Sequence, residues 1–285
     1  MGRFFNPHCL VLEETDYVNI VLCFNSQACI IANMGVLQMS KRQVMIVTGA
    51  GSGIGRATAY RLFQDGYVVV CADYNEKAAK ETADEIIRRR GEAVAFRCDV
   101  SKHEQVEALV NFTVDTFGSL NGIVNNAGIG LVKPFLEMDP ESYHKVIDVD
   151  QHGVYYGMYY TARKMVELKE KGTIINVASI YGFNVAAGSF NYHAAKAAVV
   201  IMTKSGGLEL APYDIRVVGV APGFINTPIL GNDQNFKDML AKQHMRGRLI
   251  QPEDVAETIA FLASPNAWAI NGTIVPVDDG FLAFK

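Results

Sequence analysis

The sequence predicts an α/β protein built on a doubly wound parallel sheet. Three observations indicate it: apolar segments alternate with helical ones from residue 41 onward, the first apolar segment ends in a glycine-rich turn, and no internal repeat occurs. Strands that are apolar throughout belong in a parallel sheet covered by helices on both faces. Because crossovers between parallel strands are right-handed, we expect one Rossmann-like domain of seven strands in the order 3-2-1-4-5-6-7.

Each element follows from its own pattern. Short apolar runs rich in β-branched residues predict strands, at residues 43–48, 67–73, 93–99, 120–125, 173–178, 215–221 and 273–277. Apolar residues at helical spacing predict helices between them, at residues 53–64, 76–90, 102–117, 140–168, 189–210 and 252–263. The segment 140–168 is expected to form one long helix. Strands and helices thus alternate along the whole domain.

Composition excludes several classes of protein. The chain has 285 residues, of which 49% are apolar and 20% charged, as is usual for a globular domain. Its net charge is -4 without a basic cluster, which gives no electrostatic basis for binding nucleic acid. Five cysteines without a C-x-x-C spacing favour a reducing, cytoplasmic location. No metal site is expected, because His152 and His244 lack a Cys or an acid at ligand spacing.

Residues 1–40 differ from the catalytic domain expected at residues 41–285. They contain one basic residue, Arg3, and residues 17–40 carry no charge. Polar residues interrupt this stretch, whereas a membrane span needs about 20 mostly apolar residues. Signal and presequence patterns do not fit either. We expect an N-terminal extension that is an over-long gene start, with initiation at Met34 or Met39, or else a packed extension or an oligomer contact; membrane association is the least favoured interpretation.

A glycine-rich turn after the first strand predicts a dinucleotide site. Glycines at positions 49, 51, 53 and 55 allow the backbone to turn sharply and to approach a phosphate. The helix that follows offers free N–H groups to a pyrophosphate. Asp73 ends the second strand, where a carboxylate can bind the adenosine ribose and repels the 2′-phosphate of NADP. The pattern favours NAD as the cofactor; the alternative interpretation of Asp73 is a helix N-cap.

A serine, a tyrosine and a lysine carry the predicted chemistry. Tyr192 and Lys196 are four residues apart and share one helix face. A free tyrosine has a pKa of about 10, and a neighbouring ammonium lowers that pKa. Ser179 follows the fifth strand at the carboxyl edge of the sheet, where ligands bind. Its hydroxyl can hydrogen-bond a substrate oxygen.

From residue 41 to its end, the chain resembles a short-chain dehydrogenase/reductase of the compact, single-domain subfamily. The motifs that carry this resemblance are individually weak, but their order and spacing are specific. They are the turn at residues 48–55, Asp99-Val100, Asn125-Asn126-Ala127-Gly128, Ser179 thirteen residues before Tyr192, Tyr-x-x-x-Lys at Tyr192 and Lys196, and Pro222-Gly223 with Thr227.

The resemblance implies hydride transfer between NAD(H) and a secondary alcohol or ketone. It makes Tyr192 the general acid/base, Lys196 the ligand of the nicotinamide ribose that also lowers the pKa of Tyr192, and Ser179 the residue that orients the substrate. The implied cofactor residues are Gly49, Ser52, Gly53, Ile54, Gly55, Asp73, Asp99, Val100, Asn126, Ala127, Gly128, Tyr192, Lys196, Pro222, Gly223, Ile225 and Thr227. The family usually forms tetramers through its two longest helices, here residues 140–168 and 189–210.

Two positions depart from the family pattern. Asp150 stands where the family usually has an Asn that helps to hold a water linking the Lys to bulk solvent. Asp150 is therefore a catalytic candidate; if it lies near Lys196, it should stabilise the ammonium and partly offset its effect on Tyr192. The Asp-Gly-Gly that often follows the last strand is Asp278-Asp279-Gly280 here, which we expect to be a mild change.

The substrate site is less well defined. Ile180, Tyr181, Phe190 and Phe224 are expected to line it beside Ser179 and Tyr192, and they suit an alcohol or ketone. By resemblance, the segment between Thr227 and Gln251 covers the substrate. Its basic residues, Lys237, Lys242, His244, Arg246 and Arg248, predict either a preference for anionic substrates or a solvated helix.

Two alternative functions stay open at this point. One is an NADPH-linked 3-oxoacyl reductase, which Asp73 disfavours. The other is a catalytically silent dinucleotide-binding protein that acts through partner contacts. Asp150 and the unusual N-terminus support the silent protein, whereas the intact Ser179, Tyr192 and Lys196 argue against it.

Overall fold

The computed structural model describes residues 9–12, 20–23 and 42–284, and the chain divides into two units, Met1–Arg42 and Gln43–Lys285. In the first unit, β1 (Cys9–Leu12) and β2 (Ile20–Cys23) pair as an antiparallel two-stranded sheet, which the sequence analysis does not anticipate. The rest of the extension expected at residues 1–40 lies outside the described residues.

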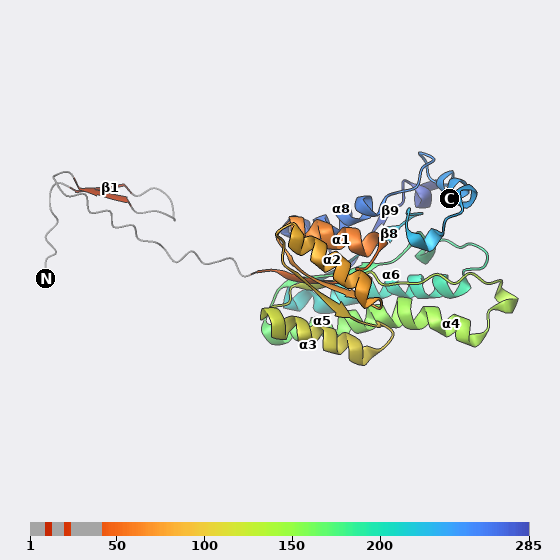
Figure 1. Cartoon of the computed structure of the whole chain (residues 1–285), viewed down its shortest axis with the longest axis horizontal. Helices are drawn as coiled ribbons and strands as arrows, with labels where there is room; N and C mark the ends of the chain where they lie inside the picture. Colours follow the sequence, from red (N-terminus) through yellow and green to blue (C-terminus); the bar gives the residue numbers. More distant parts are fainter. Residues whose placement is uncertain (1–8, 13–19, 24–41, 285) are drawn as a thin grey trace. The chain divides into compact units, whose positions relative to one another are not determined.

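The second unit contains a parallel sheet of seven strands (Figure 1). The strands are β3 (Val44–Thr48), β4 (Val68–Asp73), β5 (Ala93–Arg97), β6 (Gly122–Asn125), β7 (Gly172–Val177), β8 (Ile215–Pro222) and β9 (Ile274–Val277). Their spatial order is β5-β4-β3-β6-β7-β8-β9, and every neighbouring pair is parallel. Counted along the chain within this sheet, that is the order 3-2-1-4-5-6-7, so the predicted Rossmann-like fold is confirmed.

Helices cover both faces of this sheet (Figure 1). One layer consists of α1 (Gly53–Gln64), α2 (Glu76–Arg88) and α8 (Pro252–Ala263); the other consists of α3 (His103–Phe117), α5 (Gly153–Leu168) and α6 (Phe190–Leu210), with α4 (Pro140–Ile147) packed on α6. Successive strand residues point to opposite faces. In β3, Met45 and Val47 pack in the core between the sheet and α1, α2 and α8. Val44 and Ile46 pack in the core on the opposite face, which α3 and α5 cover.

The prediction of one continuous helix at residues 140–168 is wrong in one respect. A π-helical turn, Asp148–His152, separates α4 from α5. The backbone stays helical through the turn, with φ -60° and ψ -43° at Ile147 and φ -57° and ψ -40° at Gly153. Apolar spacing alone does not reveal such a turn, because one extra residue is absorbed without a break. π-Helical turns frequently occur at functional sites, and this one places Asp150 in the interior.

Two short helices were not predicted as separate elements. They are α7 (Gln234–Ala241), which begins where Asp233 caps the backbone N–H groups of Asn235 and Phe236, and α9 (Phe281–Phe284) near the C-terminus. Across the described ranges, no helix combines the length and apolar character that a membrane crossing requires.

Deleting residues 1–38 is expected to leave folding and turnover intact, because the seven-stranded sheet begins at Val44. The thermal midpoint should shift by less than about 2 °C, which corresponds to less than about 1 kcal/mol. A matched core variant, Ile175→Ala in the buried strand β7, should cost about 2–5 kcal/mol. Thermal unfolding and light scattering measure both effects. A truncated protein that aggregates or changes its oligomeric state would show that the extension packs against the domain.

Candidate active site

A cavity of about 1140 Å³ lies at the carboxyl ends of the strands. It exceeds the usual range of roughly 300–1,000 Å³ for small-molecule sites, so it offers room for a cofactor and a substrate together. Most of the predicted site residues line it, namely Gly49, Ser52, Gly53, Ile54, Asp73, Asp99, Val100, Asn126, Ala127, Gly128, Asp150, Ser179, Ile180, Tyr181, Tyr192, Lys196, Pro222, Gly223, Phe224, Ile225 and Thr227.

Two predicted residues, Gly55 and Phe190, do not line the cavity. Gly55 lies behind the turn, where a Cβ would overlap the carbonyl oxygen of Gly49. Phe190 begins α6 two residues before Tyr192, about 200° around the helix. Its ring packs 4.9 Å from the ring of Phe135 and 6.2 Å from that of Tyr143. Phe190 is therefore not part of the substrate wall that we expected.

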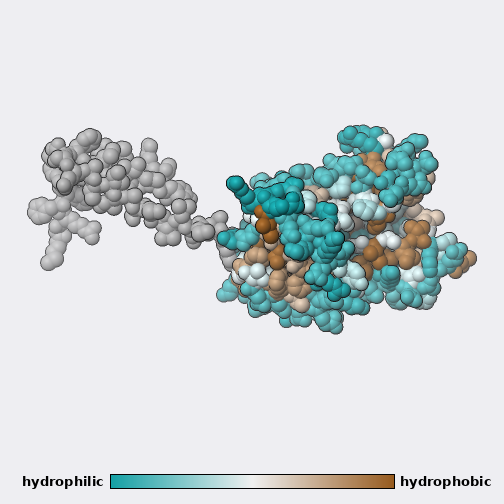
Figure 2. All heavy atoms as spheres, in the orientation of Figure 1, coloured by the Kyte–Doolittle hydropathy of each residue, from teal (hydrophilic) through white to brown (hydrophobic). Residues whose placement is uncertain are grey.

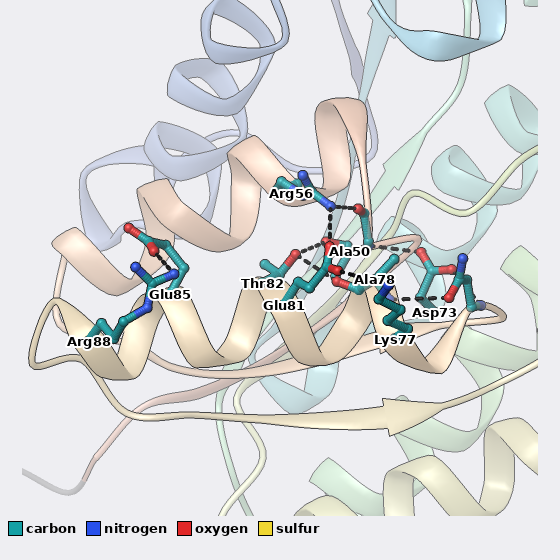
Figure 3. A network of polar contacts seen from close by, with 11 residues as sticks. Ala50, Arg56, Asp73, Lys77, Ala78, Glu81, Thr82, Glu85 and Arg88 are labelled. Carbon is teal, nitrogen blue, oxygen red and sulfur yellow. Dashed lines mark hydrogen bonds and ion pairs between the residues drawn. The ribbon is translucent and has the colours of Figure 1, made fainter.

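Asp73 stabilises the glycine-rich turn by hydrogen bonds from its carboxylate. Its carboxylate accepts hydrogen bonds from the backbone N–H of Gly51, at 2.8 Å, and of Asn75, at 2.8 Å. The N-cap of α2 is Asn75, which excludes the alternative that Asp73 caps this helix. Figure 3 shows Asp73 at the end of this polar network. The carboxylate thus has a structural function and also borders the cavity.

Side chains of α1 and α2 hold the turn from the side (Figure 3). Thr82 donates a hydrogen bond to the carbonyl oxygen of Ala50 at 2.9 Å. The Arg56 guanidinium donates to the carbonyl oxygen of Gly51 and lies 4.0 Å from the carboxylate of Glu81. The turn is therefore fixed by contacts within the protein.

The turn fits the diphosphate of a dinucleotide. Gly49 and Gly53 have φ values of +66° and +50°, which favour glycine. A Cβ at Gly49 would lie 2.8 Å from Nδ2 of Asn126. Ser52, the N-cap of α1, makes no side-chain capping bond, so the first N–H groups of α1 are left for an anion.

A buried ion pair lies beneath the centre of the cavity. The Lys196 ammonium is 3.2 Å from Oδ2 of Asp150 and donates a hydrogen bond to the Val177 carbonyl oxygen at 3.0 Å. The exposed fractions of the two side chains are only 3% and 0%. Asp150 Oδ1 accepts from the Ile129 N–H at 2.8 Å, whereas Oδ2 accepts no well-aligned hydrogen bond. The contact of Oδ2 with Lys196 is thus mainly electrostatic.

The charges of this pair stabilise each other. Burial alone would lower the pKa of Lys196, but the Asp150 carboxylate and Tyr192 raise that pKa above its ordinary value. Burial raises the pKa of Asp150, and Lys196 opposes this change. Lys196 therefore stays an ammonium at neutral pH.

The pKa of Tyr192 is raised, contrary to the lowering that we expected. Burial is the main cause; Lys196 and a hydrogen bond with Ser179 lower the pKa, and Asp150 raises it. The Lys196 ammonium lies 5.4 Å from the centre of the Tyr192 ring. The predicted effect of Lys196 is present, but burial and the Asp150 charge outweigh it.

The substrate end of the cavity is largely apolar. The rings of Tyr181 and Phe224 meet edge to face at 6.1 Å. Sequence analysis missed a further set of lining residues on α7, namely Phe236, Met239 and Leu240. Their i, i+3, i+4 spacing is the signal that could have predicted an apolar helix face. The expectation for this segment rested instead on its basic residues. Residues 226–249, which contain α7, are called the lid below.

The histidines have structural partners. His244 is 3% exposed; its Nε2 accepts from the Phe224 N–H at 3.1 Å, and its Nδ1 lies 2.8 Å from the Arg248 carbonyl oxygen. His152 lies 3.1 Å from Asp148, so the expectation that it has no acid at a suitable spacing was wrong. In the part of the chain that the structure describes, no three His, Cys or acidic side chains are grouped as metal ligands.

A tyrosine beside a buried lysine, in one cavity with a glycine-rich turn at a helix N-terminus, is the arrangement expected of a nicotinamide-dependent oxidoreductase. Residues 49–282 match the family described as enoyl-(acyl carrier protein) reductase. Cyclohexanol dehydrogenase of Acinetobacter sp. (strain SE19) is 40% identical over 84% of this chain and 94% of that protein. A 3-oxoacyl-[acyl-carrier-protein] reductase of Synechocystis sp. (strain ATCC 27184 / PCC 6803 / Kazusa) is 40% identical over 85% of this chain and 98% of that protein.

The solved structure of levodione reductase superimposes with a TM-score of 0.82 and 31% identity, over 86% of this chain and 99% of that one. The chain therefore belongs to the short-chain dehydrogenase/reductase family. It is an oxidoreductase of alcohol and ketone groups that uses a nicotinamide dinucleotide.

Replacing Tyr192 by Phe should reduce turnover by about 10²–10⁴-fold, the usual contribution of a general acid/base. The ring is kept and only the hydroxyl is lost, so NADH binding should persist. Steady-state kinetics and fluorescence titration measure the two quantities. Tyr213→Phe, which removes a hydroxyl from an exposed ring that does not line the cavity, is the control and should retain turnover. Activity near the wild-type level in Tyr192→Phe would refute this mechanism.

Asp150→Asn should stay active and shift the pH profile of alcohol oxidation to lower pH. Asp150 raises the pKa of Tyr192, so removing its charge lowers that pKa. The phenolate that accepts the alcohol proton then forms at lower pH. Asp84→Asn, which removes the same charge from the surface of α2, is the control and should leave the profile unchanged. An identical profile in Asp150→Asn would contradict the electrostatic account. A large loss of activity would show that Lys196 needs the carboxylate to stay charged or that the carboxylate has a catalytic role of its own.

Proposed function

We propose that this protein is an NAD(H)-linked dehydrogenase of uncharged secondary alcohols, cyclic ones included, and of the corresponding ketones. The observation that supports it most is the apolar part of the wall of the cavity that Ser179 and Tyr192 also line; it is formed by Tyr181, Phe224 and three residues of α7. The relatives named as acting on cyclohexanol and levodione support the same substrate class.

The residues divide the proposed chemistry among them. In oxidation, the Tyr192 phenolate accepts the hydroxyl proton of the alcohol, and the Ser179 hydroxyl holds the same oxygen. Lys196 stabilises the phenolate by its charge. When bound, the nicotinamide accepts the hydride in oxidation and supplies it in reduction. Ile225 and Thr227, which line the cavity beside Gly53, would hold its carboxamide.

Asp73 supports NAD over NADP. Its carboxylate borders the cavity at the end of β4, where it would repel a 2′-phosphate. Among the described residues that line the cavity, Lys145 and Lys196 are the only Lys or Arg. Neither belongs to the glycine-rich turn or to the loop after β4, so neither would pair with that phosphate.

The lid favours an uncharged substrate. Its cations, Lys237, Lys242, Arg246 and Arg248, do not line the cavity. Lys237 donates to Asn226 at 3.3 Å, and Arg246 pairs with Asp279 at 2.6 Å. Figure 2 shows apolar residues gathered on parts of the surface of the second unit. Val132 and Ile229, which line the cavity, are exposed on this surface. An apolar entrance suits an apolar substrate.

The surface of α5 and α6 supports a homotetramer, and the free cysteines support a cytoplasmic location. Tyr155, Tyr159 and Val166 on α5, and Ile201 and Leu208 on α6, are all exposed. A group of large apolar side chains on the surface is typical of a contact between subunits. The buried free thiols of Cys71 and Cys98 are compatible with a reducing compartment.

A 3-oxoacyl reductase is the second candidate, because the Synechocystis relative is as similar as the cyclohexanol dehydrogenase. An NADPH-linked reductase of this kind would have to bind both an acyl thioester and NADPH. The carboxylate of Asp73 opposes that cofactor.

Turnover of a substrate panel with both cofactors tests the proposal. Cyclohexanol with NAD⁺ should give a kcat/KM at least about tenfold above that with NADP⁺, a difference of about 1.4 kcal/mol. Asp73→Asn, which keeps one acceptor oxygen for the turn, should narrow the preference. Faster reduction of a 3-oxoacyl thioester with NADPH would instead establish the second candidate. NADH binding without turnover of any substrate would indicate the silent dinucleotide-binding protein.

A further inference from the structure

The two ends of the lid meet at one base, just beyond the carboxyl end of β8. A parallel bridge joins Ile225 to Ile250; the Asn226 N–H donates to the Ile250 carbonyl oxygen at 2.9 Å, and the Ile250 N–H donates to that of Phe224 at 3.2 Å. Everything between these residues, α7 included, extends from this base. The position of α7 over the cavity therefore depends on further contacts.

Asp279 supplies such contacts from the loop after β9. Its carboxylate accepts from the backbone N–H of Arg246 at 2.9 Å and from Nε of the same residue at 2.6 Å. Its carbonyl oxygen accepts from the Met245 N–H at 3.1 Å. The carboxylate is 9% exposed although the guanidinium is 67% exposed. Three bonds thus connect Asp279 to two consecutive lid residues.

The backbone of Asp279 would suit a glycine. Its φ is +47°, and only three other non-glycine residues in the described ranges have positive φ, namely Arg90, Lys169 and Asp214. Those three lie at the C-terminal ends of helices, where such a conformation is common. Asp279 instead lies between β9 and α9. A glycine would adopt this conformation at no steric cost, and what the Asp279 side chain adds is its bonds to the lid.

These bonds are close to the substrate wall. Arg246 follows the end of α7 by five residues, and Phe236, Met239 and Leu240 of α7 line the cavity. Between α7 and Arg246, His244 is bonded to the backbone of Phe224, which also lines the cavity. The segment between α7 and the base is thus held at two places, by His244 on Phe224 and by Met245 and Arg246 on Asp279. Loss of the second contact leaves α7 with less to fix its position relative to the wall.

We propose that Asp279 is a positioning residue for the substrate: by holding Met245 and Arg246, it fixes the distance between α7 and the reacting carbon. The substrate part of this statement rests on the proposed function, whereas the contact with the lid does not. An ion pair with an exposed partner contributes little to overall stability. Its effect should accordingly appear in substrate binding and lid motion.

The test is Asp279→Gly, which removes the carboxylate and suits the positive φ. The KM for cyclohexanol should rise about tenfold, while the KM for 2-propanol, the Kd for NADH and the thermal midpoint stay unchanged. Hydrogen exchange of residues 234–248 should accelerate, because these amides lose their anchor. Arg246→Gln should reproduce the rise in KM, and the double variant should add little to either single variant, as expected for residues in contact.

Asp214→Gly is the matched control. Asp214 also has a positive φ, +57°, and pairs with Lys171 at 2.6 Å, but it precedes β8 at the opposite end of the sheet. This variant should change neither KM nor exchange in the lid. An unchanged KM for cyclohexanol in Asp279→Gly would overturn the proposal, even if exchange accelerates. If the wild-type protein oxidises no secondary alcohol, the proposed function fails, and the exchange rate alone then supports or overturns the anchor.

Discussion

The buried charge of Lys196 is the constraint on which the site depends. An ammonium that is almost inaccessible to water is stable only beside compensating groups, and here these are the Val177 carbonyl oxygen and the Asp150 carboxylate. They come from the end of β7 and from the π-helical turn between α4 and α5. The sheet, the π-helical turn and α6 must therefore be formed together. Tyr192 then lies beside the Lys196–Asp150 ion pair, which has no net charge.

The parts of the fold that sequence analysis predicted correctly are those encoded locally. Apolar runs located the seven strands, and the handedness of crossovers fixed their order. The π-helical turn escaped, because it changes hydrogen bonding without changing the apolar spacing. Phe190 was misplaced for a related reason: proximity to Tyr192 in sequence does not put a residue on the same face of a helix.

The site shows the same division between local and distant information. The tyrosine and lysine could be paired from their spacing, and the glycines from their succession. The contact between Asp279 and Arg246 joins residues 33 apart in sequence and has no local signature. The direction in which the pKa of Tyr192 shifts could not be predicted from sequence either. It depends on the balance between the burial of Tyr192 and its interactions with Lys196 and Asp150.

The double role of the Asp73 carboxylate has a consequence for engineering. One of its oxygens holds the Gly51 N–H and the other holds the Asn75 N–H. Exchanging Asp73 for a small apolar residue, as a designer would do to admit a phosphorylated ribose, also removes both acceptors that hold the glycine-rich turn and the start of α2. A successful redesign must therefore include a substitute acceptor, such as Asn or Ser at the same position, together with a new cation. With the proposed role of Asp73, coenzyme preference and loop rigidity would be coupled through a single side chain.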